Sequence, residues 1–92
     1  MGTVMVKEGD YVAIFNSVHR VMKAEKLLKG EKLPILLIPA PRALSSDCGL
    51  AIRYADTDRE RVETLLASSS LNPEEIYQMR ATRFARVDKE LL

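Results

Sequence analysis

The residue best suited to chemistry in this 92-residue chain is its single cysteine, Cys48. It stands at the end of the segment Ile38-Pro39-Ala40-Pro41-Arg42-Ala43-Leu44-Ser45-Ser46-Asp47-Cys48-Gly49, whose prolines restrict the backbone. A thiolate attacks other sulfur atoms, and positive potential nearby favours it over the thiol. Arg42 supplies such a charge, and Gly49 would let a substrate come close to the sulfur. The segment therefore predicts a loop for sulfur chemistry, with a small apolar core residue as the other interpretation of Cys48.

The counts of reactive side chains exclude several kinds of site. One cysteine cannot form an internal disulfide, and one cysteine with one histidine cannot build the usual tetrahedral zinc cluster. A Ser-His-Asp triad would have to use His19, and nothing else in the sequence provides an oriented base for a thiol hydrolase. We therefore expect neither a metal nor a cofactor.

Charge and hydropathy point to a chain that works in the cytoplasm. The formal net charge is +1, which gives no general attraction to nucleic acid, and the basic residues near the C-terminus are interleaved with acids. No apolar run approaches the roughly 20 residues that cross a bilayer, and the N-terminus lacks the pattern of a signal peptide. A free thiol without an export signal indicates a reducing compartment.

Hydrophobic patterning predicts a single α+β domain over 1–92. Apolar runs and helical periodicity give the order strand, helix, strand, strand, helix, strand, with these elements at 11–16, 18–29, 33–38, 49–54, 59–69 and 75–79. This order predicts a two-layer ferredoxin-like βαββαβ sandwich with a core over 11–79. Residues 1–10 are expected to form an N-terminal extension and residues 80–92 a helical or frayed tail. The alternative for the last segment is one helix over 72–92, because Asn72 and Pro73 suit a helix start and the apolar residues from Ile76 onward also fit half of a helical wheel.

The predicted topology brings the cysteine close to a helix N-terminus. The start of the third strand and the ends of the first two share one sheet edge with the start of helix 18–29. Cys48 would then lie near the partial positive charge of that helix, where Ser17 is the expected N-cap and His19 lies in the first turn.

Helix 18–29 is expected to bury one apolar arc and to end at a glycine. Its arc of about 120° holds Val18, Val21, Met22 and Leu28, and Gly30 is placed to adopt the left-handed conformation after the last turn. Glu25 also falls on the arc, so we expect it to form an ion pair with a lysine or with Arg53.

Three stretches of the chain resemble a known family. They are Tyr11-Val12-Ala13-Ile14-Phe15-Asn16-Ser17, Ala24-Glu25-Lys26-Leu27-Leu28, and the Pro-x-Pro-Arg…Ser-Ser-x-Cys-Gly…Arg string that runs from Pro39 to Arg53. The family is called putative selenium/sulfur carrier-like, a small prokaryotic domain of unknown function, and the resemblance covers about residues 11–79. Some relatives carry a second cysteine shortly after the first. Here Leu50, Ala51 and Ile52 follow instead, which excludes a resolving cysteine within one chain.

The resemblance implies that Cys48 holds sulfur or selenium as a persulfide or perselenide. It also implies that a set of neighbouring residues shapes the loop, with Arg53 close by: Pro39, Pro41, Arg42, Ser45, Ser46 and Gly49. The chain would be a thiol carrier rather than a turnover enzyme. Its partners would be a donor protein, of the cysteine desulfurase kind, and an acceptor protein.

A module without covalent chemistry is the alternative function. In this interpretation Cys48 is structural and the loop binds a small anion or a protein. The first two strands are apolar on both faces, yet two helices cover only one side of a four-stranded sheet. We therefore expect the open face to form a homodimer unless the tail covers it.

Overall fold

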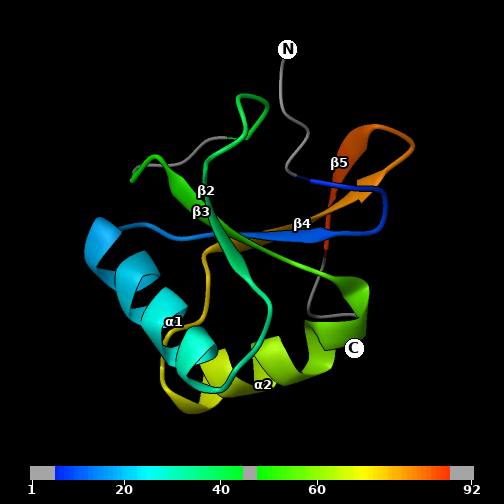
Figure 1. Cartoon of the computed structure of the whole chain (residues 1–92). Coiled ribbons are helices and arrows are strands. Elements are labelled where there is room, and N and C mark those ends of the chain that lie inside the picture. The colour runs from blue at the N-terminus through cyan, green and yellow to red at the C-terminus, as the bar shows by residue number, and fades with distance from the viewer. Residues whose placement is uncertain (1–5, 45–47, 88–92) are drawn as a thin grey trace.

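The computed structural model describes residues 6–44 and 48–87, which form an antiparallel sheet of five strands with two α-helices on one of its faces (Figure 1). The strands are β1 (Tyr11–Ile14), β2 (Leu36–Pro39), β3 (Leu50–Tyr54), β4 (Glu75–Arg80) and β5 (Arg83–Arg86). The helices are α1 (Val18–Gly30), α2 (Arg59–Ser68) and the short 3-10 helix η1 (Asp56–Asp58). The strand order is β2-β3-β1-β4-β5, so β1 lies at the centre.

The predicted four-stranded ferredoxin-like sandwich is wrong, because the sheet has a fifth strand. The segment expected to be a helical or frayed tail contributes β5, which pairs with β4 in the register Arg80↔Arg83 and Met79↔Phe84. Ala81 and Thr82 make the connection with φ of 49° and 64°. Two consecutive left-handed residues are typical of a type I′ hairpin turn, which usually carries Asn-Gly. The Ala-Thr pair gave no such signal.

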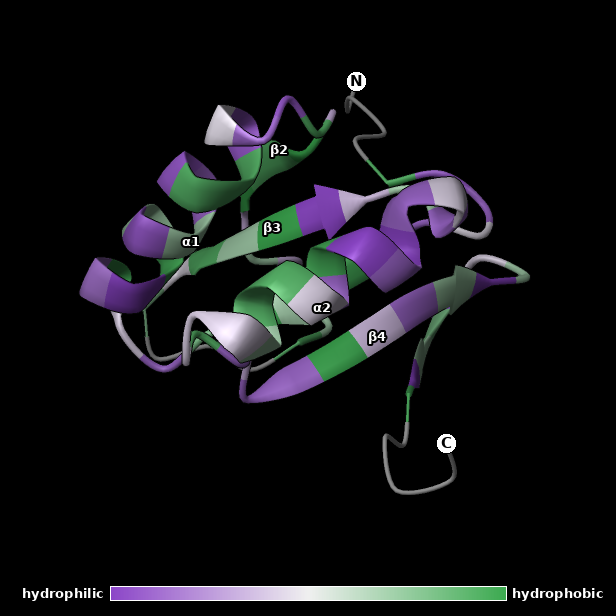
Figure 2. Cartoon of the chain, turned by 90° about the horizontal axis from the view of Figure 1, so that it is seen from below, coloured by the Kyte–Doolittle hydropathy of each residue, from purple (hydrophilic) through white to green (hydrophobic). Residues whose placement is uncertain are grey.

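Both faces of the sheet are buried within one chain. The helix side packs around Tyr11, Phe15, Ile52 and Tyr54 together with the buried faces of α1 and α2. Figure 2 looks onto this side and shows both helices in front of the strands. All four residues of β1 are buried, as expected for a central strand covered on two sides.

The second face also has its own apolar cluster. Its buried members are Val6, Val12, Ile14, Ile38 and Ala51, and partly buried side chains pack on them, among them Leu44 from the loop after β2 and Phe84 from β5. The argument for a homodimer assumed that this face was bare. Val6, Leu44 of the loop after β2 and Phe84 of β5 pack on this face, so one chain covers it in part, and the homodimer stays a prediction.

Helix α1 buries a narrower stripe than expected. Ser17 caps it, since its Oγ accepts from the Arg20 N–H at 3.1 Å. Val21, Ala24 and Leu28 are buried, whereas Val18 and Met22 of the predicted arc are 51% and 43% exposed. The buried stripe is centred on Ala24, whose small side chain lets α1 approach the sheet. Val18 and Met22, at the edge of the predicted arc, stay exposed.

The end of α1 also differs from the prediction. Gly30 is the last helical residue and not a left-handed cap, because the positive φ of 62° belongs to Lys32. The Leu33 N–H then donates to the Leu28 carbonyl at 3.1 Å and closes the turn. Glu25 does form the expected ion pair with a lysine, at 3.0 Å from Lys29 Nζ.

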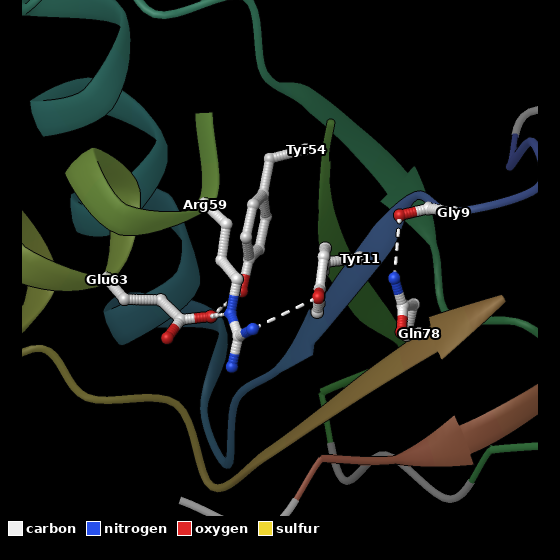
Figure 3. A network of polar contacts seen from close by, with 6 residues as sticks. All are labelled: Gly9, Tyr11, Tyr54, Arg59, Glu63 and Gln78. Carbon is white, nitrogen blue, oxygen red and sulfur yellow. Dashed lines mark hydrogen bonds and ion pairs between the residues drawn. The ribbon is translucent and has the colours of Figure 1, made fainter. Parts of the chain in front are cut away.

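A polar network fastens α2 to one end of the sheet (Figure 3). The rings of Tyr11 and Tyr54 stack with centroids 5.6 Å apart, and the Arg59 guanidinium lies 4.8 Å from the centroid of Tyr11. Arg59 Nη1 donates to the Tyr11 hydroxyl at 3.2 Å, and the Tyr54 hydroxyl donates to Glu63 Oε2 at 2.9 Å. Burial of Tyr54, and after it the negative charge of Glu63, raises the pKa of the Tyr54 hydroxyl. Both hydroxyls are thus held in the neutral form.

Candidate functional site

Cys48 lies where three segments of the chain meet. Its Sγ lies 3.4 Å from the carbonyl oxygen of Phe15 and 3.3 Å from that of Leu50, so these two acceptors share the single thiol proton. Phe15 follows β1 and stands two residues before the N-cap of α1, so the sulfur lies beside the start of this helix. The side chain is half-buried and packs against the helix-side core. Cys48 is therefore both a core contact and a partly accessible thiol.

The backbone on either side of Cys48 is held by the end of β2. Pro39 pairs with Leu50 in the sheet register, and the Ala40 N–H donates to the Gly49 carbonyl at 2.9 Å. Gly49 has a φ of +74°, which side chains rarely adopt. A Cβ placed on Gly49 would meet nothing within 4 Å. The glycine is thus needed for its conformation, and the space beside it is open.

The start of α1 brings unneutralised positive potential to this edge of the sheet. Its first turn has no acidic side chain, so nothing there offsets the partial positive charge of the helix N-terminus. The Ser17 Oγ accepts a hydrogen bond from the Arg20 N–H, so Ser17 is the N-cap that the sequence predicted.

Arg42 and His19, the expected cationic partners of the sulfur, both lie on the surface. Arg42 is exposed in the turn that the Leu44 N–H closes on the Pro41 carbonyl at 2.9 Å. His19 is exposed in the first turn of α1, on a hollow that it shares with Val18 and Met22. Within the described ranges, no hydrogen bond joins either side chain to Cys48. Their contribution would come through a bound anion or partner.

Two predicted loop residues, Ser45 and Ser46, lie outside the described residues, as does Asp47. Pro39 is the last residue of β2 and thus lies one residue inside the strand that it was predicted to stop, whereas Pro41 begins the turn that contains Arg42.

Arg53 does not join the cysteine and instead occupies the other end of the central strands. Its Nε lies 3.2 Å from Oδ2 of Asp10, the residue just before β1, whereas Cys48 contacts Phe15 just after β1. Burial of Asp10 (7% exposed) explains the pair, because a buried carboxylate needs a counter-charge. The same carboxylate accepts from the Lys7 N–H at 2.9 Å. The prediction that Arg53 lies near the thiol is therefore wrong.

Asp10 is the polar residue that the sequence interpretation missed. It is the only buried charged residue in the part of the chain that the structure describes. A weak signal was present, because Asp10 follows Gly9 in a turn and directly precedes an entirely apolar strand. Nothing in that pattern identified Arg53, which lies on a different strand and 43 positions later, as its partner.

Among the described residues, the candidate site contains one thiol, that of Cys48. Residues 6–44 and 48–87 contain no group of three His, Cys, Asp or Glu side chains that could hold a metal ion. No helix in the same ranges is long and apolar enough to cross a membrane. What the arrangement can do is exchange a sulfur atom at Cys48, or pack the thiol as part of the core.

Comparison with known proteins identifies one family. No curated protein and no solved structure matched the chain. A family model described as "Putative Se/S carrier protein-like" matches residues 10–78, which begin at Asp10, include Cys48 and end in β4. This match spans most of the chain and agrees with the resemblance seen in the loop motif. The chain therefore belongs to the Putative Se/S carrier protein-like family.

Proposed function

We propose that this protein carries a sulfur or selenium atom on Cys48, taking it from a donor protein as a persulfide or perselenide and delivering it to an acceptor protein. The observation that carries the proposal is the setting of Cys48: a half-buried thiol beside the start of α1, followed by a glycine in the left-handed conformation. Membership of the family supports the same conclusion. The proposed location is the cytoplasm, where a lone thiol stays reduced.

The transfer balances without any added oxidant. The Cys48 thiolate attacks the outer sulfur of a donor persulfide, so that a bond forms between Sγ and this sulfur while the donor's sulfur–sulfur bond breaks. The donor leaves as a thiolate and takes up the proton that Cys48 released. Delivery follows the same chemistry. An acceptor thiolate attacks the outer sulfur, the bond between Sγ and this sulfur breaks, and Cys48 is released as a thiolate. Because the whole sequence holds one cysteine, the atom must leave to another molecule.

The start of α1 supports the loaded form of the protein. A thiol donates to the two carbonyl oxygens, but a persulfide anion has no proton for them and carries its charge on the outer sulfur. That charge is stabilised where positive potential is available, at the N-terminus of α1. Arg42, exposed in the preceding turn, is the side chain that we assign to the outer sulfur, and His19 lies in the first turn of the same helix.

The test is direct loading with a small persulfide. We expect the chain treated with cysteine persulfide to gain the mass of one sulfur atom, the Cys48→Ser variant to gain none, and dithiothreitol to remove the added sulfur. The unfolded chain in urea is the matched control, since it contains the same thiol without its setting. Faster loading of the folded chain supports the carrier. No adduct on the folded chain would refute it.

A second candidate is a protein-interaction or anion-binding module in which Cys48 is structural. The packing of Cys48 against the helix-side core, with both carbonyl contacts, favours this function. Alkylation with iodoacetamide at neutral pH separates the two proposals. Modification of the folded chain at least as fast as of the unfolded chain supports the carrier, and strong protection supports the module.

A further inference from the structure

The outer face of α1 exposes apolar side chains that the fold does not use. Three large hydrophobic residues are exposed in the described ranges, and two of them, Val18 and Met22, stand one helical turn apart on α1. They line one hollow of 240 Å³ together with His19, Lys23 and Lys26. Exposed apolar side chains grouped in this way, with a polar border, are typical of surfaces that bind another protein.

The same face is basic. Lys23 and Lys26 border the first hollow and also a second one of 350 Å³, whose other walls are Leu27, Ser69 and Leu71. Neither hollow is lined by an acidic side chain. Among the described residues, Lys23 and Lys26 take part in no ion pair, whereas the neighbouring Lys29 is neutralised by Glu25. We call the surface formed by Val18, His19, Met22, Lys23 and Lys26 the α1 face.

The α1 face begins beside the candidate site. Val18 is the first residue of α1 and follows by three positions Phe15, whose carbonyl oxygen accepts from the Cys48 thiol. From Val18 to Lys26 the helix rises by about 12 Å. A protein seated along this face would have one end at the edge of the sheet where Cys48 lies.

We infer that the α1 face is the docking surface for the protein that donates sulfur to Cys48, and that this donor presents acidic side chains around an apolar one. The inference rests on the proposed function, because it assigns a surface to the donor. Complementary charge would steer the two proteins together and orient the donor persulfide, whereas Val18 and Met22 would supply the apolar contact. A second copy of this chain is disfavoured as the occupant, because a twofold contact would bring the two lysine pairs together.

The test compares two synthetic donor peptides of equal length. Each bears one cysteine persulfide and two leucines; one is flanked by glutamates and the other by lysines. The initial rate of sulfur gain on Cys48, followed by intact mass, is expected to be about tenfold higher with the acidic peptide. The Lys23→Glu/Lys26→Glu variant should reverse this preference, and Val18→Ser/Met22→Ser should slow both peptides.

Two controls separate this inference from the carrier proposal. Lys7→Glu/Arg83→Glu makes the same change of net charge at two exposed positions outside α1 and should keep the preference for the acidic peptide. Cysteine persulfide, which needs no docking, should load every variant at the wild-type rate. Equal loading rates with both peptides would overturn the docking surface. So would a control variant, Lys7→Glu/Arg83→Glu, that changes the peptide preference as much as Lys23→Glu/Lys26→Glu does. In either case, loading by cysteine persulfide would still uphold the carrier. Failure of cysteine persulfide to load the wild type overturns both.

Discussion

The Cys48 Sγ lies 3.4 Å from the carbonyl oxygen of Phe15, so the thiol ties the start of β3 to the turn between β1 and α1. This contact exists for a thiol and not for a thiolate, which has no proton to donate. Under the proposed carrier function, loading of Cys48 would exchange a structural hydrogen bond for a charge beside α1. Whether the cysteine serves mainly structure or chemistry can be measured as the cost of removing it.

Cys48→Ala is expected to lower the free energy of unfolding by about 1 kcal/mol, since it removes a weak hydrogen bond and the partly buried sulfur. Urea unfolding followed by circular dichroism measures this value. Arg42→Ala, an exposed position in the neighbouring turn, serves as the control and should change it by less than about 0.5 kcal/mol. A loss above about 3 kcal/mol at Cys48 would indicate a structural cysteine and favour the interaction module.

Tyr54→Phe should weaken the dependence of stability on alkaline pH. Burial raises the pKa of Tyr54 and of Tyr11 above the value of 10.0 for an exposed tyrosine. Below pH 10 both the folded and unfolded chains keep these protons. Above it the unfolded chain releases both protons while the folded chain keeps that of Tyr54, so the free energy of unfolding falls by about 1.4 kcal/mol per pH unit for Tyr54. Tyr11 adds to this fall only until the pH reaches its own raised pKa.

Tyr54→Phe removes one of these titrating protons. It also removes the hydrogen bond to Glu63, which should lower the free energy of unfolding by about 1 kcal/mol near pH 8. Urea titrations at several pH values between 8 and 11 give both quantities. Tyr77→Phe is a useful comparison, because a hydrogen bond to Glu75 and then burial raise the pKa of this half-exposed tyrosine. A slope for Tyr54→Phe equal to that of the wild type would contradict the neutral, buried hydroxyl.

Asp10→Asn should destabilise the fold without affecting Cys48. The change leaves the Arg53 guanidinium, which is mostly buried, without its counter-charge at the end of β1 away from the thiol. We expect a loss of about 2 kcal/mol in urea unfolding and unchanged loading by cysteine persulfide. Arg53→Gln breaks the same pair from the other side and should behave alike. If either variant is folded in the absence of urea and still fails to load with cysteine persulfide, Arg53 belongs to the functional site.

The strands and helices up to Ser68 were predictable because local patterns encode them, and the strand at β4 was favoured over a helix that the same residues also fit. β1 and β3 are short apolar runs, Ser17 caps α1 as expected, and β4 covers the strand predicted at 75–79. The fold class was not predictable in the same way. β5 depends on a hairpin whose Ala81 and Thr82 lack the usual turn residues, and its apolar positions also fit half of a helical wheel.

The position of Cys48 in the fold was predictable from the sequence, and the positions of its expected neighbours were less so. The loop motif singled out Cys48 and Gly49, and topology brought the cysteine beside α1. Arg53 was misplaced because its position depends on a pairing with Asp10 across the sheet, which no local pattern encodes. The exposure of Val18 and Met22 was not predictable either, because a helical arc shows which residues are apolar and not how much of the arc packs against the sheet.

Gly49→Ala and Gly30→Ala form a matched pair that tests the backbone beside the thiol. A Cβ at either position would meet nothing within 4 Å, so sterics with neighbours do not distinguish them. Gly49 has a φ of +74°, and alanine there should cost about 1 kcal/mol. Gly30 is helical, and alanine there should stabilise α1 by roughly 0.5 kcal/mol. Urea unfolding measures both, and Gly49→Asn should lose less than Gly49→Ala because asparagine tolerates the left-handed region. If Gly49→Ala proved as harmless as Gly30→Ala, the turn that presents Cys48 would not depend on the left-handed glycine.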